Sequence, residues 1–235
     1  MIDIHSHLIY GVDDGSKTLE ESISILENLS NKGITDIIFT PHYITDTRYV
    51  SERKNNYEEL LTIKEELKIR GININVYLGN EIYIDKNITN LVLDRKISTL
   101  NNTHYILVEL PMNGIYDDYI DIFSNLIRTG FKVILAHPER YTSIQKDYSL
   151  VNELKEIGVL FQSNFGSFSG QYGREAKKIV KKLAKDKLIS FMGTDIHKEK
   201  DLIYTEKGIK KLEKYYSKEE LDDILINNPK DILTK

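Results

Sequence analysis

The amino-acid sequence predicts an α/β protein built on a parallel β-sheet. Short runs rich in β-branched and aromatic residues alternate with amphipathic segments, at a spacing typical of repeated strand–helix units. Seven such units follow one another, and no linker, low-complexity segment or Pro/Gly-rich boundary interrupts them. Seven consecutive units favour a closed barrel over an open sheet, and we expect a single domain over residues 1–235.

The first two units can be placed by their end signals. We expect a strand over residues 2–8 and, after the loop GVDDGSK, a helix. Thr18 and Glu21 have the spacing of a capping box at the start of that helix, and Gly33 is placed to end it. The segment DIIFTPH is the second strand, and a long charged helix is expected over about residues 52–70, before Gly71.

The other five units have the same form. INVYLGNEIYI is the third strand, with a helical turn near Asn90, and HYILVEL is the fourth, with a helix over about residues 118–129. KVILAHP is the fifth strand, with a helix that runs to Gly158. VLFQSNF is the sixth, before a lysine-rich helix near residues 175–185, and LISFMGTDIH is the seventh, before the C-terminal helices.

Composition narrows the classes of function. The 235-residue chain has a formal net charge of −4, which gives no reason to expect nucleic-acid binding. It contains no cysteine, which excludes disulfides, a thiolate nucleophile and cysteine-rich zinc sites. No stretch approaches the roughly 20 apolar residues of a membrane span, and no signal peptide is visible. We therefore expect a cytoplasmic protein.

Polar side chains gather at the ends of the predicted strands, which form the active face in barrels of this class. Five histidines and four carboxylates lie at such ends, namely His5, His7, Asp14, His42, Glu81, Glu109, His137, Asp195 and His197. Four carboxylates buried together would repel one another and lose hydration, and divalent cations would offset both costs. A histidine and carboxylate set without sulfur suits manganese, iron, zinc or magnesium. Nine donors are too many for one ion and about right for two or three.

Each of these residues also has an ordinary interpretation. A single histidine is more often a surface or core residue, and a single strand-end acid is more often solvated or a helix cap. Glu109 is harder to explain in this way, because strand alternation turns it toward the barrel interior, where a lone acid is costly without a cation. The basic run REAKKIVKKLAKDK is best interpreted as a solvated helix face, with a docking surface for an acidic partner as the alternative.

Seven segments, taken in order, resemble a known family: DIHSH, VDDG, TPH, GNEIYI, VEL, AHPER and GTDIH. They are similar to the polymerase-and-histidinol-phosphatase (PHP) metal hydrolases. More closely, they resemble the bacterial protein-tyrosine phosphatases encoded with capsule and exopolysaccharide genes, over nearly the whole chain. The resemblance implies a distorted (β/α)7 TIM-like barrel that holds three divalent ions, with manganese first and iron, zinc, cobalt or magnesium as alternatives.

The resemblance also implies the ligands of each ion. By that pattern the first metal is held by His5, His7, Glu81 and Asp195. Glu81 bridges to the second metal, which Glu109 and His137 complete. The third metal is held by Asp14, His42 and His197.

Phosphate-ester hydrolysis then needs further groups from the chain. Arg140, three residues after His137, is placed to clamp the phosphoryl group, with a surface salt bridge as the alternative. Asp3 lies on the same strand face as His5 and could orient a ligand imidazole. The segments HYITDTRYV and NFGSFSGQYG are expected to border an open, shallow rim. One feature departs from the family: related phosphatases carry an arginine after the last D-x-H, whereas this chain offers only Lys198, Lys200 or Arg174.

Three functions compete at this stage. The first is a metal-dependent phosphatase acting on the phosphotyrosine tail of a bacterial capsule kinase, which would regulate polysaccharide biosynthesis. The second is a small-molecule phosphatase of the same superfamily, such as a histidinol-phosphatase. The third is a barrel that binds metal for stability or partner recruitment without turnover, and the complete ligand set disfavours it.

Overall fold

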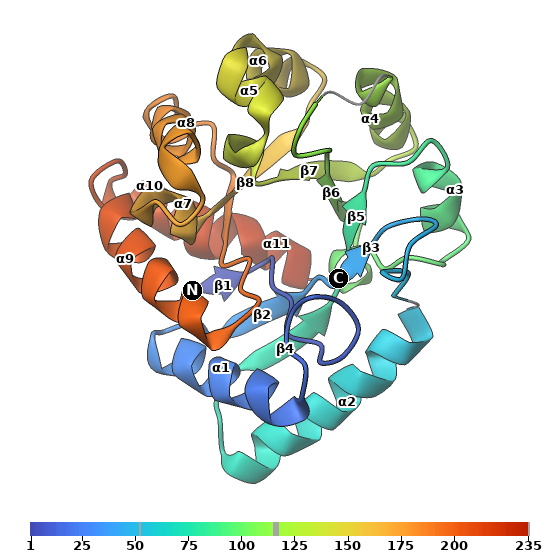
Figure 1. The fold of residues 1–235 in the computed structure, drawn as a ribbon, viewed down its shortest axis with the longest axis vertical. Coiled ribbons are helices and arrows are strands. Elements are labelled where there is room, and N and C mark those ends of the chain that lie inside the picture. Colours follow the sequence, from blue (N-terminus) through green and yellow to red (C-terminus); the bar gives the residue numbers. More distant parts are fainter. Residues whose placement is uncertain (52, 115–117, 235) are drawn as a thin grey trace.

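A computed structural model describes residues 1–51, 53–114 and 118–234 of the protein, as a ring of parallel strands surrounded by helices (Figure 1). The strands are β1 (Ile2–Asp3), β2 (Asp36–Phe39), β3 (His42–Tyr43), β4 (Asn75–Leu78), β5 (Glu81–Tyr83), β6 (Tyr105–Glu109), β7 (Lys132–Ala136), β8 (Leu160–Asn164) and β9 (Phe191–Gly193). They form two parallel sheets, in the orders β1-β2-β4 and β3-β5-β6-β7-β8-β9.

Backbone pairing beyond the regular strands joins the last strand to the first. Ser6 and Ile196 form a parallel bridge, and the His7 N–H donates to the Ile196 carbonyl at 3.0 Å. The Asp195 N–H donates to the His5 carbonyl at 2.9 Å. The ring therefore closes, which confirms the predicted TIM-like barrel.

The second and third predicted strands are each divided into two. The expected strand over residues 36–42 becomes β2 and β3, and the one over 74–84 becomes β4 and β5, so that each crosses from one sheet to the other. Pro41 has no N–H to donate to a ladder, which explains the first break. Gly79 lies at the second break, where an added Cβ would come within 2.6 Å of Leu100.

The outer layer is helical. Its α-helices are α1 (Leu19–Asn31), α2 (Arg53–Arg70), α3 (Ile88–Leu93), α4 (Tyr119–Arg128), α5 (Thr142–Lys146), α6 (Ser149–Glu156), α7 (Phe165–Ser169), α8 (Gly173–Lys185), α9 (Leu202–Leu212), α10 (Lys218–Asp222) and α11 (Asn228–Leu233). Shorter turns are η1 (Leu100–Asn102), η2 (Pro138–Arg140), η3 (Glu199–Asp201) and the π-helical η4 (Asp223–Asn227). No helix among the described residues is both long and apolar enough to cross a membrane.

The helix boundaries follow local side-chain chemistry. Thr18 caps α1 by accepting from the Glu21 N–H at 3.2 Å, and Glu21 reaches back to the Lys17 N–H at 2.8 Å. The single helix expected before Gly158 is instead α5 and α6. Asp147 causes this break, because its carboxylate accepts from the Ser149 N–H at 3.0 Å and starts a new helix. Residue 52, the expected start of the second helix, lies outside the described residues.

Alternation along the central strands separates the outer core from the barrel interior. Val108 and Leu135 belong to a large apolar cluster that includes side chains of α4, α6 and α8. Leu107 and Ile134 belong to a different cluster, which Ile232 of α11 joins. Glu109 lies two residues after Leu107 on β6, so it continues the interior row at the carboxyl end of the strand. The apolar interior therefore gives way to polar side chains at that end.

Candidate metal centre

The structure brings all nine predicted ligand residues together at the carboxyl ends of the strands. Their nitrogen and oxygen atoms form four overlapping groups, and within each group the atoms lie within 4.8 Å of one another. The groups are His5–His7–Glu81, His5–His137–Asp195, His42–Glu81–Glu109 and His7–Asp14–His42–His197. Shared members, Glu81 foremost, link the groups into one cluster.

Glu81 lies at the centre of this cluster and is 1% exposed. Its Oε1 is 2.8 Å from His137 Nε2 and 3.4 Å from His5 Nε2. Its Oε2 is 2.9 Å from His42 Nδ1 and 3.4 Å from His7 Nε2. Although burial opposes it, the imidazoles of His5 and His42 hold the pKa of Glu81 well below its usual range. Each carboxylate oxygen thus faces a different pair of imidazoles, which is the geometry of a bridging ligand.

Glu109 and His137 form the next part of the cluster. Glu109 Oε1 is 3.6 Å from His137 Nε2. Burial and the neighbouring Glu81 carboxylate raise the pKa of Glu109 to about 8. Burial and the nearby Arg140 charge lower the pKa of His137 to about 4, so its imidazole is neutral and can act as a ligand.

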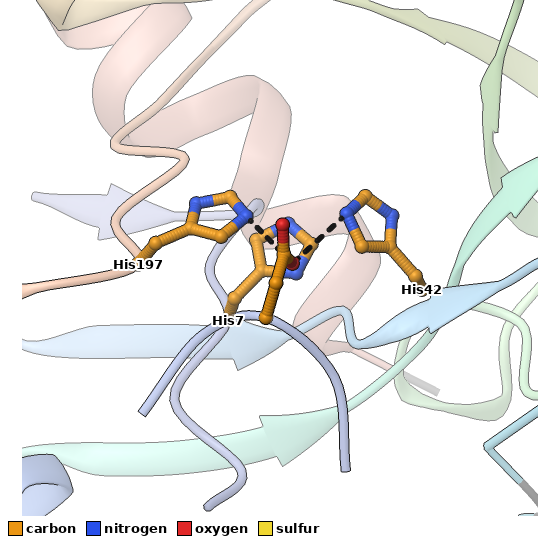
Figure 2. A group of neighbouring side chains, drawn as sticks. His7, His42 and His197 are labelled. Atoms are coloured by element: carbon orange, nitrogen blue, oxygen red, sulfur yellow. Dashed lines mark ion pairs between the residues drawn. The ribbon is translucent and has the colours of Figure 1, made fainter. Parts of the chain in front are cut away.

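The third part lies nearest the surface and is built around Asp14, whose side chain is 51% exposed. Asp14 Oδ1 is 3.3 Å from His197 Nε2 and 3.5 Å from His42 Nε2. The rings of His7, His42 and His197 come from three different parts of the chain and converge here (Figure 2). Although burial opposes it, Glu81 and Asp14 raise the pKa of His42 to about 10.

Two residues outside the predicted set hold the imidazoles in place. Asp13 Oδ2 lies 2.7 Å from His7 Nδ1, and Gln162 Oε1 lies 2.8 Å from His5 Nδ1. Each contact fixes the ring so that Nε2 faces the cluster, the arrangement seen behind metal-binding histidines. Neither residue belongs to the set predicted from the sequence. The motif VDDG contained a signal for Asp13, because it places a second carboxylate beside the predicted ligand Asp14.

Asp3 contacts the backbone and Thr194 instead of orienting an imidazole directly. Its carboxylate accepts from the Thr194 hydroxyl at 2.6 Å, the Thr194 N–H at 3.0 Å and the His5 N–H at 3.1 Å. These bonds tie the first strand to the segment after β9. Asp3 therefore positions the chain on which His5 lies, and Gln162 orients the ring.

Arg140 is held at the edge of the cluster by a buried carboxylate. Its Nη1 donates to Asp195 Oδ2 at 2.6 Å, and its guanidinium lies 4.4 Å from the ring centre of Tyr172. Asp195 Oδ2 also accepts from Asn164 at 2.7 Å and from the Tyr172 hydroxyl at 3.2 Å. The arginine is thus oriented from both sides, and the alternative of a loose surface salt bridge does not describe it.

A surface pocket of about 300 Å³ opens beside Arg140. Its lining residues include Asp14, Arg140, Gln171, Tyr172, Asp195, His197, Lys198 and Lys200. Lys198 and Lys200, two of the three possible substitutes for the missing arginine, therefore line the pocket. The third, Arg174, lines a groove on α8 instead. The segments expected at the rim are also here: Tyr49 lies 6.0 Å from His42 between ring centres, and Gln171 and Tyr172 line the pocket.

The donor set fits divalent cations. Five imidazoles and four carboxylates converge, and three of the carboxylates, Glu81, Glu109 and Asp195, are buried. The buried Glu81 Oε2 accepts no hydrogen bond within the described part of the chain; His42 Nδ1 lies 2.9 Å from it, and a bound metal ion would take the place of the proton that this pair otherwise shares. A mixed nitrogen and oxygen set without sulfur suits manganese, iron or zinc better than it suits magnesium or calcium, which prefer oxygen ligands alone.

The closed barrel and this histidine–carboxylate cluster define the class, which is a metal-dependent hydrolase with a TIM-like fold. Residues 1–234 match the family described as capsular polysaccharide synthesis, CpsB/CapC, and the chain belongs to that family.

Curated relatives and a solved structure agree with this membership. The tyrosine-protein phosphatase YwqE of Bacillus subtilis is 31% identical over 220 residues, which are 93% of this chain and 86% of that protein. The tyrosine-protein phosphatase CpsB of Streptococcus pneumoniae is 28% identical over 239 residues, 99% of this chain and 98% of that protein. A crystal structure from work on these two proteins, described there as unique metal-dependent tyrosine phosphatases, matches with a TM-score of 0.89 and 31% identity. It covers 95% of this chain and 91% of that one.

Proposed function

We propose that this protein hydrolyses phosphotyrosine on a protein substrate with the help of divalent metal ions. The observation that carries the proposal is the buried Glu81 carboxylate, which lies between two pairs of imidazoles close to Arg140 and its pocket. The two relatives compared above support the same activity, because YwqE and CpsB are both named tyrosine-protein phosphatases. The chain has no cysteine, so the thiolate route is closed to it.

The cluster offers ligands for three ions, with manganese as the first candidate. We assign the first ion to His5, His7, Glu81 and Asp195, the second to Glu81, Glu109 and His137, and the third to Asp14, His42 and His197. The group His7–Asp14–His42–His197 contains the third set, and the group His5–His7–Glu81 contains three members of the first. The second set is supported by His137 Nε2, which lies 2.8 Å from Glu81 Oε1 and 3.6 Å from Glu109 Oε1. When bound, the ions would act as Lewis acids that offset the negative charge of the phosphoryl oxygens, and they would lower the pKa of the water that they bind.

The remaining steps belong to side chains of this protein. Arg140 uses Nη1 to bind Asp195, and a guanidinium has further N–H groups with which to clamp a phosphoryl group. Asp195 and Tyr172 hold the guanidinium in place, so little side-chain entropy is lost when the ester binds. Lys198 and Lys200 add positive charge to the same pocket as point charges, without the forked geometry of arginine.

The pocket favours an aryl ester presented from outside. It opens at the surface, and Tyr172 gives it an aromatic wall beside Arg140. The tyrosine phenolate, with an ordinary pKa near 10, leaves without a strong general acid. We propose that the substrate is the phosphotyrosine tail of a bacterial capsule kinase, that the reaction takes place in the cytoplasm, and that residues 1–235 act as one phosphatase domain.

The test compares substrates on the manganese-loaded protein. We expect kcat/KM to be much higher for a phosphotyrosine peptide than for the same peptide with phosphoserine, and higher than for histidinol phosphate. An aryl phosphate should likewise exceed an alkyl phosphate. A better kcat/KM for histidinol phosphate would replace the proposed function with the small-molecule alternative.

A further inference from the structure

The surface of α8 carries a concentration of unpaired positive charge. The helix has six cations, Arg174, Lys177, Lys178, Lys181, Lys182 and Lys185, and one acid, Glu175. These six cations line a groove of about 460 Å³. Glu175 approaches Lys178 at 3.8 Å, and Lys182 lies 3.5 Å from the ring centre of Tyr148. The other four form no ion pair with the described residues.

The positive surface extends from α8 to α9. Lys177 and Lys181 of α8, together with Lys207 and Lys214, lie close enough to Lys211 of α9 that their charges add to burial in lowering its pKa. We use the name basic track for Arg174, Lys177, Lys181 and Lys185 of α8 with Lys207, Lys211 and Lys214. Like charges held this close repel one another, in a chain whose net charge is −4.

An ordinary solvated helix looks different in this same protein. On α2, five cations are interspersed with four acids, and Arg70 pairs with Glu66 and with Glu20 of α1. The charges of α2 are therefore largely balanced within the protein. Those of the basic track are not, which points to an anionic partner.

The basic track begins where the substrate pocket ends. Gln171 and Tyr172 line the pocket and directly precede α8, while Lys198, Lys200 and Asp201 line it and directly precede α9. Both helices follow strands that end at the site, and α7, α8 and α9 lie side by side on the outside of the barrel (Figure 1). Positive charge is thus present in the pocket, at Arg140, Lys198 and Lys200, and again on the two helices that follow the pocket residues in the chain.

We propose that the basic track is the docking surface for an acidic segment of the substrate polypeptide that flanks the phosphotyrosine. This inference rests on the proposed function and names the substrate chemistry that the site selects. The rise from Arg174 to Lys185 is about 16 Å at the ~1.5 Å per residue of an α-helix. An extended peptide covers that distance with about five residues, so a run of about five acids matches the track.

The experiment compares peptides that carry one phosphotyrosine and a run of five glutamates, on its N-terminal or its C-terminal side, with peptides that carry glutamine instead. The ratio of kcat/KM for the acidic peptide over its neutral counterpart reports docking and cancels effects on the site itself. Because single surface charge pairs contribute little, we expect a ratio of about tenfold for one orientation at low salt, falling toward one as salt is raised.

Two matched variants locate the effect. One removes charges of the basic track by Lys177→Gln, Lys181→Gln and Lys211→Gln. The other removes the same number from α2 by Lys54→Gln, Lys64→Gln and Lys68→Gln. We expect the first variant to bring the ratio close to one and the second to keep it. The first should unfold at no lower temperature than the wild type, since it relieves repulsion.

The outcomes separate the two proposals. The docking inference alone would be overturned if the wild type hydrolysed every peptide with a kcat/KM ratio near one. It would also be overturned if the two variants gave the same ratio as each other. A third result would also overturn it: the first variant keeps the wild-type kcat/KM ratio but no longer binds phosphatidylglycerol vesicles. That result would assign the basic track to a membrane surface. No turnover of any phosphotyrosine peptide would overturn the proposed function, and this inference with it.

Discussion

Asp13 offers a sharp test of the site, because it supports a ligand without being assigned as one. Its carboxylate accepts three hydrogen bonds: from His7 Nδ1 at 2.7 Å, from the Gly15 N–H at 2.9 Å and from the His42 N–H at 3.1 Å. Asp13→Ala leaves these donors buried without an acceptor. Each unsatisfied buried donor costs about 1–3 kcal/mol, so the variant should lose at least about 3 kcal/mol of unfolding free energy.

The same change should weaken metal binding without removing a ligand. When His7 loses the partner of its Nδ1, its ring is free to rotate and change tautomer. Loss of such a partner typically lowers metal affinity by about 10–100-fold. We therefore expect Asp13→Ala to need correspondingly more manganese for half-maximal activity and to recover much of its turnover at saturation.

Asp14→Ala is the matched control, one residue away. Asp14 is half exposed and contacts His42 and His197 at the rim, so its loss should change the unfolding free energy little. It should instead lower the number of bound ions by one. Urea unfolding with a chelator present measures stability, and elemental analysis with manganese titration measures binding. Wild-type manganese affinity in Asp13→Ala, or a larger stability loss in Asp14→Ala, would refute the reasoning.

Three further predictions concern the metal site and the packing of α9. A chelator should abolish phosphatase activity, and manganese should restore more of it than magnesium, because imidazole ligands suit manganese better; full activity of the metal-stripped protein would contradict this. His137→Ala should lose bound metal and nearly all turnover, whereas Arg140→Ala should keep its metal and lose phosphate affinity and part of the rate; elemental analysis with the opposite result would reverse these roles. Gly208→Ala places a Cβ 2.0 Å from the Phe165 carbonyl, so it should cost about 1–3 kcal/mol in urea unfolding despite alanine's higher helix propensity, and an unchanged midpoint would count against it.

The clustering of the nine candidate ligands could be predicted because it follows from strand position. In a parallel barrel, the residues at the carboxyl ends of all strands meet on one face, whatever their separation in the chain. Glu81 and Glu109 are 28 positions apart, yet their strands pair in register, with Tyr83 opposite Glu109. Alternation on β6 was sufficient to turn Glu109 inward.

The supporting contacts could not be predicted in the same way. Three neutral residues provide these contacts. Gln162 binds the His5 ring, and Asn164 and Tyr172 donate to Asp195. Nothing in their local sequence distinguishes them from other polar residues on a strand or before a helix. Their roles arise from the pairing of β8 with β9 and from the closure that joins the segment after β9 to the first strand, which are properties of the fold and not of any one segment.

His137 illustrates why alternation alone does not place every candidate ligand. On β7, Ile134 and Ala136 face the barrel interior, so regular alternation would turn residue 137 outward. His137 instead adopts a left-handed backbone conformation, with φ 33° and ψ 56°, and its side chain joins Glu81 inside the site. Such a conformation costs a non-glycine residue about 1–2 kcal/mol, and Pro138, which follows, has no N–H with which to continue the strand ladder. The fold therefore accepts local backbone strain to place an imidazole beside the Glu81 carboxylate, which is the expected location for strain that serves function.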